Sequence, residues 1–154
     1  KLSKPVFVKM PIEKTNKDVL DMVEILIQFP FIKGVIIGNL QKDRNNPTFD
    51  TKEIASMPKG NFSGKPTWER SNELIALIYT YYKKRLVIIG CGGVFSGEDA
   101  YTKIKLGASL VQLITGLIFE GPQLVAQINI KLLELLKKDG YKNISEAIGT
   151  GLPR

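Results

Sequence analysis

The chain contains four short runs of apolar residues, each typical of a strand that is buried on both faces of a sheet. These runs cover residues 5–10, 34–38, 86–89 and 110–114. Between the first two runs, apolar residues such as Val19, Val23 and Leu26 recur at the spacing of an amphipathic helix. The pattern therefore predicts strands that alternate with helices.

Capping signals indicate where the helices begin and end. Thr15 and Asp18 have the spacing of a capping box, Ser96 and Asp99 repeat it, and Gly107 stands where the second of these helices should end. Further helices are predicted over residues 68–82 and 122–138, with a short helical turn at 145–148. Residues 41–66 are polar and rich in Pro and Gly, which predicts a long loop; loops of this length are usually functional or disordered.

This order of elements predicts a parallel sheet whose strands are joined by right-handed crossovers. Four βα units are half of a (β/α)8 barrel, and a small open flavodoxin-like sheet is the alternative. Half a barrel would leave two sheet edges and one core face uncovered. In either fold, ligands bind at the carboxyl ends of the strands.

Composition narrows the possible functions. The 154 residues suffice for one domain, and the net charge of +7 comes from scattered lysines, which indicates a solvated surface rather than a nucleic-acid site. One Cys and no His exclude an internal disulfide, a His-based triad and a His-ligated metal within these residues. No apolar run is long enough to span a membrane, and the start at Lys1 without Met suggests a piece of a longer protein.

A glycine-rich loop follows the third strand and is a candidate phosphate site. Gly90, Gly92 and Gly93 surround Cys91, and the next strand ends at Thr115 and Gly116. Glycines allow the backbone to approach an anion with its N–H groups. The alternative is a tight turn with nothing bound. The chain has neither the P-loop nor the GxGxxG motif.

Polar residues also follow the first two strands. Lys9 carries a cation at the end of a buried strand, where an unpaired charge is costly unless it faces a ligand. Asn39 can donate and accept hydrogen bonds, which suits a planar heterocycle. Ser63 and Gly64 add a hydroxyl and a backbone N–H. A solvated lysine and ordinary turn residues are the alternative interpretation.

Several of these segments together resemble the carboxyl-terminal half of dihydroorotate dehydrogenase. In chain order they are VFVKM, GVIIGN, FSGKP, LVIIGCGGVFSGEDAYTKI, GASLVQLITG, FEGPQLV and KDGYKNISEAIG. SGKP and GASLVQL are similar to the membrane-associated, quinone-reducing class 2 enzymes rather than to the soluble class 1. The resemblance implies that residues 1–154 supply the last four βα units of an FMN-binding (β/α)8 barrel.

The resemblance also implies roles for individual residues. Lys9 would stabilise negative charge on the reduced flavin, and the pyrimidine would contact Asn39 and Leu40. The implied FMN-binding residues are Lys9, Gly38, Ser63, Gly64, Gly92, Gly93, Ile114 and Thr115. No metal is implied, and the catalytic serine base is expected in the family's first half.

In this family, FMN accepts hydride from dihydroorotate to give orotate, and a quinone then reoxidises the flavin. The implied partners are therefore dihydroorotate or orotate, a quinone bound through the amino-terminal region, and the first half of the same barrel. A peripheral location on the inner membrane of a bacterium or mitochondrion follows from the same resemblance.

The chain departs from the family at three of these positions. The family usually has Thr-Asn-Thr where this chain has Gly38, Asn39 and Leu40, and a tyrosine where it has Ile114. PIEK also replaces an Ala-Pro-Asp run after the first strand. A non-catalytic flavin- or phosphate-binding half-barrel, or a class 1 type enzyme, is therefore the alternative interpretation.

Overall fold

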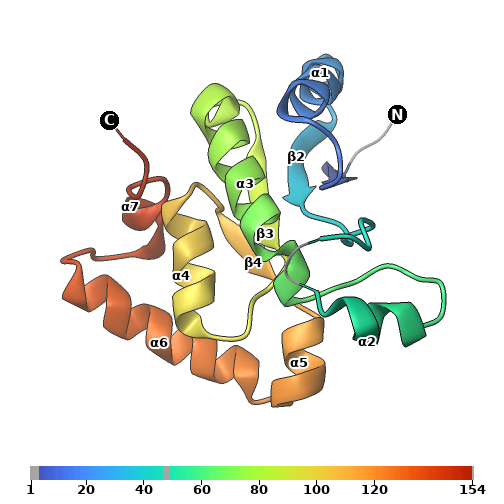
Figure 1. Ribbon diagram of the computed structural model, residues 1–154. Coiled ribbons are helices and arrows are strands. Elements are labelled where there is room, and N and C mark those ends of the chain that lie inside the picture. The colour runs from blue at the N-terminus through green and yellow to red at the C-terminus, as the bar shows by residue number, and fades with distance from the viewer. Residues whose placement is uncertain (1–3, 47–48, 154) are drawn as a thin grey trace.

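The computed structural model describes residues 4–46 and 49–153, so the predicted domain of residues 1–154 and the predicted loop at 41–66 are each described in part. Four strands form one parallel sheet in the order β1-β2-β3-β4 (Figure 1). They are β1 (Val6–Met10), β2 (Ile32–Ile37), β3 (Val87–Cys91) and β4 (Leu110–Gln112). This confirms the predicted sequential order of the strands.

The main helices lie at or close to their predicted positions. They are α1 (Asn16–Leu26), α3 (Trp68–Tyr82), α4 (Gly97–Lys105), α6 (Leu124–Lys138) and the short α7 (Ile144–Ala147). Thr15 and Asp18 form the full capping box of α1, and the Ser96 hydroxyl accepts a hydrogen bond from the Asp99 N–H at the start of α4. Gly107 has φ of 120° just beyond α4, as a helix-ending glycine should.

Two segments differ from the prediction. The predicted loop at 41–66 contains α2 (Thr51–Ser56) and the 3-10 turn η1 (Lys65–Thr67), and it includes an antiparallel bridge between Gln41 and Phe62. The Asp50 side chain caps α2 by accepting from the N–H groups of Lys52 and Glu53. The strand predicted over 110–114 ends at Gln112, and α5 (Thr115–Glu120) replaces the predicted turn.

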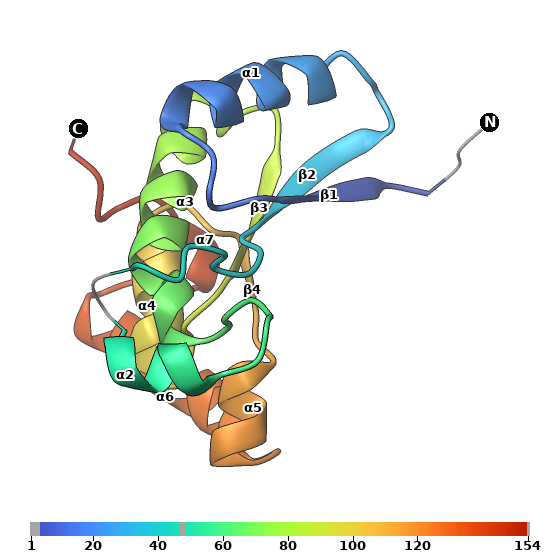
Figure 2. The same ribbon diagram turned by 45° about the vertical axis from the view of Figure 1, so that its right-hand side comes forward.

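One face of the sheet is covered by helices and the other face is not (Figure 2). Buried Val35 and Ile88 pack with residues of α1 and α3, and Val111 of β4 packs with α4 and α6. The opposite face carries Lys9, Ile36, Ile89 and Leu110 in register across the four strands. None of these four residues belongs to a hydrophobic cluster of the described residues, and Leu110 is 59% exposed.

Coverage of a single face distinguishes between the two predicted folds. An open flavodoxin-like sheet carries helices on both faces, whereas a barrel carries them on its outside only. The bare face here therefore corresponds to the interior of a barrel, and the four units form one side of its wall.

Candidate functional site

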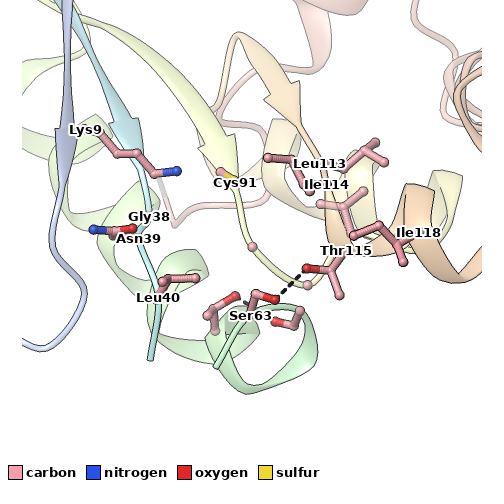
Figure 3. Close-up of a pocket in the computed structure, with 16 residues that line it drawn as sticks. Lys9, Gly38, Asn39, Leu40, Ser63, Cys91, Leu113, Ile114, Thr115 and Ile118 are labelled. Carbon is pink, nitrogen blue, oxygen red and sulfur yellow. Dashed lines mark hydrogen bonds between the residues drawn. The ribbon is translucent and has the colours of Figure 1, made fainter. Parts of the chain in front are cut away.

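A cavity of about 220 Å³ lies at the carboxyl ends of the four strands (Figure 3). Each strand or the loop after it contributes to the lining, as expected for a parallel sheet. All ten residues to which the resemblance gives a binding role line this one cavity: Lys9, Gly38, Asn39, Leu40, Ser63, Gly64, Gly92, Gly93, Ile114 and Thr115. Their common location is a property of the fold, since they come from segments far apart in the chain.

Lys9 and Asn39 lie at one end of the cavity, and Ser63 and Thr115 lie at the other (Figure 3). The Asn39 N–H donates to the carbonyl of Met10 (3.1 Å), which joins the ends of β1 and β2 and leaves the Asn39 amide side chain for other partners. Lys9 extends from β1 toward the cavity. Its side chain is exposed, because it lies on the face of the sheet that no helix covers.

Two loops meet at the Ser63 end. The Thr115 hydroxyl hydrogen-bonds to the Ser63 hydroxyl (2.9 Å). Gly64 has φ of 79°, and a Cβ atom on it would lie 3.0 Å from Cγ2 of Thr115. A side chain at Gly64 would therefore be strained in its backbone and crowded against Thr115.

The Gly92–Gly93 loop forms the third side of this end. Gly93 has φ of 72°, and a Cβ there would lie 2.8 Å from Cβ of Trp68. At Gly92 an added Cβ would lie 2.4 Å from the Thr67 hydroxyl. The loop therefore packs closely against Thr67 and the start of α3, and only glycine allows this close approach.

Three backbone donors at this end are left without a partner. Within residues 4–46 and 49–153, no hydrogen bond has the N–H of Gly64, Gly93 or Thr115 as its donor. Converging free N–H groups in glycine-rich loops form a typical binding site for an anion such as phosphate. The geometry therefore suits an anionic group at the Ser63 end.

Two opposite walls of the cavity are apolar (Figure 3). Leu40, Leu113, Ile114 and Ile118 form these walls, and Ile114 is 69% exposed. A site for a whole small-molecule ligand usually measures 300–1,000 Å³, which exceeds the cavity volume of about 220 Å³. The 154 residues thus enclose only part of a ligand the size of a nucleotide.

Two residues at the site were not recognised from the sequence. Thr67 lines the cavity, and its hydroxyl donates to the Gly64 carbonyl (2.7 Å). Lys103 lies fully buried on α4, behind the glycine loop. Lys103 is spaced like Ala100, Ile104 and Gly107, which places it on the buried face of the helix. A lysine on the apolar face of a helix is unusual, and this pattern could have identified Lys103 from the sequence.

Comparison with known proteins identifies the relatives of this chain. It matches the family described as dihydroorotate dehydrogenase over residues 1–136. The mitochondrial dihydroorotate dehydrogenase (quinone) of Oryza sativa subsp. japonica is 38% identical over 145 residues, which is 94% of this chain and 30% of the relative. The dihydroorotate dehydrogenase (quinone) of Trichodesmium erythraeum is 38% identical over 150 residues, 95% of this chain and 39% of the relative.

Solved structures give the same result. The ligand-free type DHODH from Eimeria tenella superimposes with a TM-score of 0.84 at 28% identity, over 96% of this chain and 40% of that one. The chain thus spans about 30–40% of the length of the relatives it matches, which agrees with the expectation that it supplies only part of a barrel. Family match, identity and fold together establish that this chain belongs to the dihydroorotate dehydrogenase family.

Proposed function

We propose that this chain forms the part of a quinone-dependent dihydroorotate dehydrogenase that binds the FMN phosphate, one side of the flavin ring and one side of the pyrimidine. The observation that carries the proposal is the convergence of four strand ends on one cavity with a cation at one end and free N–H donors at the other. The quinone-dependent relatives support the same assignment.

The Ser63 end fits the phosphate of FMN. The free N–H groups of Gly64, Gly93 and Thr115 can each donate to a phosphate oxygen, and the glycines leave room for the anion to approach the backbone. The apolar side chains of the cavity walls, such as Leu40 and Ile114, suit a planar ring packed between them.

When bound, FMN supplies a two-electron acceptor that takes a hydride from dihydroorotate and is reoxidised by a quinone. Lys9 offers a positive charge at the ring end of the cavity, which favours negative charge on a ligand there. The Asn39 side-chain amide can donate to a pyrimidine carbonyl and accept from a ring N–H. These residues therefore bind and orient the ligands.

No residue of the cavity serves well as the base that removes a proton from dihydroorotate. The chain has no histidine. Ser63, the serine that lines the cavity, is hydrogen-bonded to Thr115 at the end assigned to phosphate. We therefore expect the base to come from a part of the barrel outside these 154 residues, and the quinone to contact that part as well.

The same proposal includes a peripheral membrane location, because a quinone partitions into the lipid bilayer. Among the described residues, no helix has the length and apolarity needed to cross a membrane. The relative from Oryza sativa is named as mitochondrial. A second segment of the same protein, carrying the rest of the barrel, would cover the bare face of the sheet.

The phosphate assignment is tested by Gly93→Val in the full-length protein. A valine side chain at φ of 72° fills the space beside the Gly93 N–H, so we expect loss of bound FMN, measured from flavin absorbance after gel filtration. Gly60→Val is the matched control, because a Cβ at Gly60 meets no atom within 4 Å. Normal flavin content in folded Gly93→Val would contradict the assignment.

Bound FMN without turnover in the wild-type protein would instead support a non-catalytic flavin-binding module.

A further inference from the structure

Lys103 is a buried cation without a carboxylate partner. Its ammonium donates to the Ser71 hydroxyl (2.7 Å) and to the side-chain carbonyl of Asn72 (2.8 Å), and it lies 4.7 Å from the centroid of the Trp68 ring. All three partners are neutral residues of α3, and none of the ion pairs among the described residues includes Lys103. A fully buried lysine in such surroundings is rare, because burial of an uncompensated charge is costly.

The ammonium lies directly behind the glycine loop. A Cβ on Gly92 would be 3.3 Å from the Ser71 hydroxyl that Lys103 contacts, and one on Gly90 would be 3.1 Å from Cδ of Lys103 itself. The front of the same loop lines the cavity where the N–H groups of Gly93 and Thr115 are free. The Lys103 ammonium thus lies on the α3 side of the Gly92–Gly93 loop, and the candidate anion site lies on the cavity side of the same loop.

We propose that Lys103 is a positioning residue for the phosphate of FMN: its buried charge attracts the anion through the Gly92–Gly93 loop, and its hydrogen bonds to Ser71 and Asn72 hold the start of α3 against that loop. This inference rests on the proposed function, since it needs a phosphate at the Gly93 end of the cavity. The missing counter-ion of Lys103 is then the ligand itself.

A titratable counter-charge makes phosphate binding depend on pH. Burial lowers the pKa of Lys103 to about 7, against smaller opposing effects of Cys91 on β3 and Asp99 on α4, while Lys65 of η1 lowers it further. A bound phosphate favours the charged ammonium and so raises the Lys103 pKa. The protein should therefore take up a proton when FMN binds, and FMN affinity should fall as pH rises above about 7.

The test compares FMN with riboflavin, which has the same ring and ribityl chain without the phosphate. Dissociation constants of both flavins are measured by fluorescence quenching on the full-length, flavin-depleted protein between pH 6.5 and pH 9. We expect the wild-type affinity for FMN, but not for riboflavin, to fall over this range by about tenfold. The phosphate of FMN titrates near pH 6, below this range, and adds little to the effect.

Two variants and one control locate the effect. Lys103→Met should weaken FMN binding by about tenfold at pH 7, leave riboflavin binding unchanged and abolish the pH dependence. Lys103→Arg keeps a permanent charge, so it should retain FMN affinity without the decline at high pH. Lys105→Met is the control, because Lys105 lies on the same helix but pairs with Asp139.

Equal effects of Lys103→Met on both flavins, or an unchanged FMN pH profile, would overturn the inference while leaving the proposed function intact. If Lys103→Met does not fold, the comparison of the two flavins on the wild-type protein still decides: parallel pH profiles contradict the inference, and a decline for FMN alone supports it. Failure of the wild-type protein to bind either flavin would instead overturn the proposed function, and the inference with it.

Discussion

The Ile12 side chain occupies the space beside Gly38, at the ends of β1 and β2. A Cβ on Gly38 would lie 2.2 Å from Cγ2 of Ile12, too close for any side chain to fit without movement. Position 38 usually carries threonine in the family, and the PIEK segment that contains Ile12 is also unusual for it. Ile12 therefore fills the volume that a side chain at position 38 would need.

A double-mutant cycle tests this steric conflict. Gly38→Thr alone should lower the free energy of unfolding by about 1–3 kcal/mol, because it overpacks a rigid corner of the site. In an Ile12→Ala background the same threonine should cost much less, since the space is free. Urea unfolding of the four proteins gives the interaction free energy. Strictly additive effects would contradict a shared space.

Single residues were predicted well where their signal is local and poorly where it depends on packing. Lys9 lies near the end of one apolar run, and Asn39, Gly92 and Gly93 follow others, so their place at strand ends could be read from the sequence alone. The contact between Ser63 and Thr115 joins residues 52 positions apart and could not. Lys103 was missed because it looks like any other surface lysine unless the inward face of its helix is known.

At the scale of elements, Arg44 holds together the segment between β2 and η1. Its guanidinium donates to the carbonyls of Ile54 (2.8 Å) and Met57 (3.2 Å) at the end of α2, and it lies 5.2 Å from the centroid of the Phe62 ring. It also reaches the carbonyls of Pro58 and Gly60. One guanidinium thus donates to carbonyls within the short helix and in the segment just after it.

Arg44→Met should loosen α2 while the rest of the fold remains intact. Losing these hydrogen bonds should speed amide exchange of residues 51–57 by roughly tenfold, with little change in the helices that cover the sheet. Hydrogen–deuterium exchange with mass spectrometry measures both. Lys52→Met is the control, since it removes a charge from the same helix without touching these carbonyls. Unchanged exchange in Arg44→Met would show that α2 is held by other contacts.

The elements that the sequence predicted are those with a clear period or a clear cap. β1 to β4 follow apolar runs, α1 and α4 combine an apolar pattern with a capping residue, and α3 was found from its apolar pattern with its observed bounds. The two missed helices, α2 and α5, are only six residues long. Such short helices have no measurable period, and their stability comes from contacts such as those of Arg44, which sequence patterns do not contain.

For the whole molecule, Lys103 should make stability depend on pH. Its pKa lies near 7 in the folded chain and near 10.5 when unfolded, so between these values the unfolded state holds more protons. Stability of the flavin-free protein should therefore rise with pH in this interval, by about 2 kcal/mol from pH 7 to pH 9. Above pH 10 the trend should reverse, because burial and the bond to Glu24 raise the Tyr82 pKa to about 12.

Urea unfolding at pH 7, 8 and 9 measures this dependence. Lys103→Met lacks the titrating group, so its free energy of unfolding should stay nearly constant over the range. Lys105→Met should keep the wild-type slope. A wild-type stability that is flat or falls from pH 7 to pH 9 would show that Lys103 keeps its ordinary pKa in the folded protein.

The bare face of the sheet explains why these 154 residues form only part of the ligand site. Lys9 and Leu110 lie in the same register layer on this face, and the cavity opens at its carboxyl end. A barrel interior must be closed by further strands, and these would also supply the remaining walls of the ligand site. In the proposed function, the 154 residues provide binding groups for the flavin and the pyrimidine, and the proton acceptor comes from elsewhere in the barrel.

Dihydroorotate-dependent reduction of a quinone-coupled dye tests this division most directly. The full-length protein loaded with FMN should turn over, and Asn39→Ala should lower kcat/KM by about tenfold or more through loss of a substrate hydrogen bond. A polypeptide of residues 1–154 alone, supplied with FMN, should show no turnover, because it lacks the base. Turnover by that polypeptide, lost again in Asn39→Ala, would show that these residues carry a complete active site and would contradict the account.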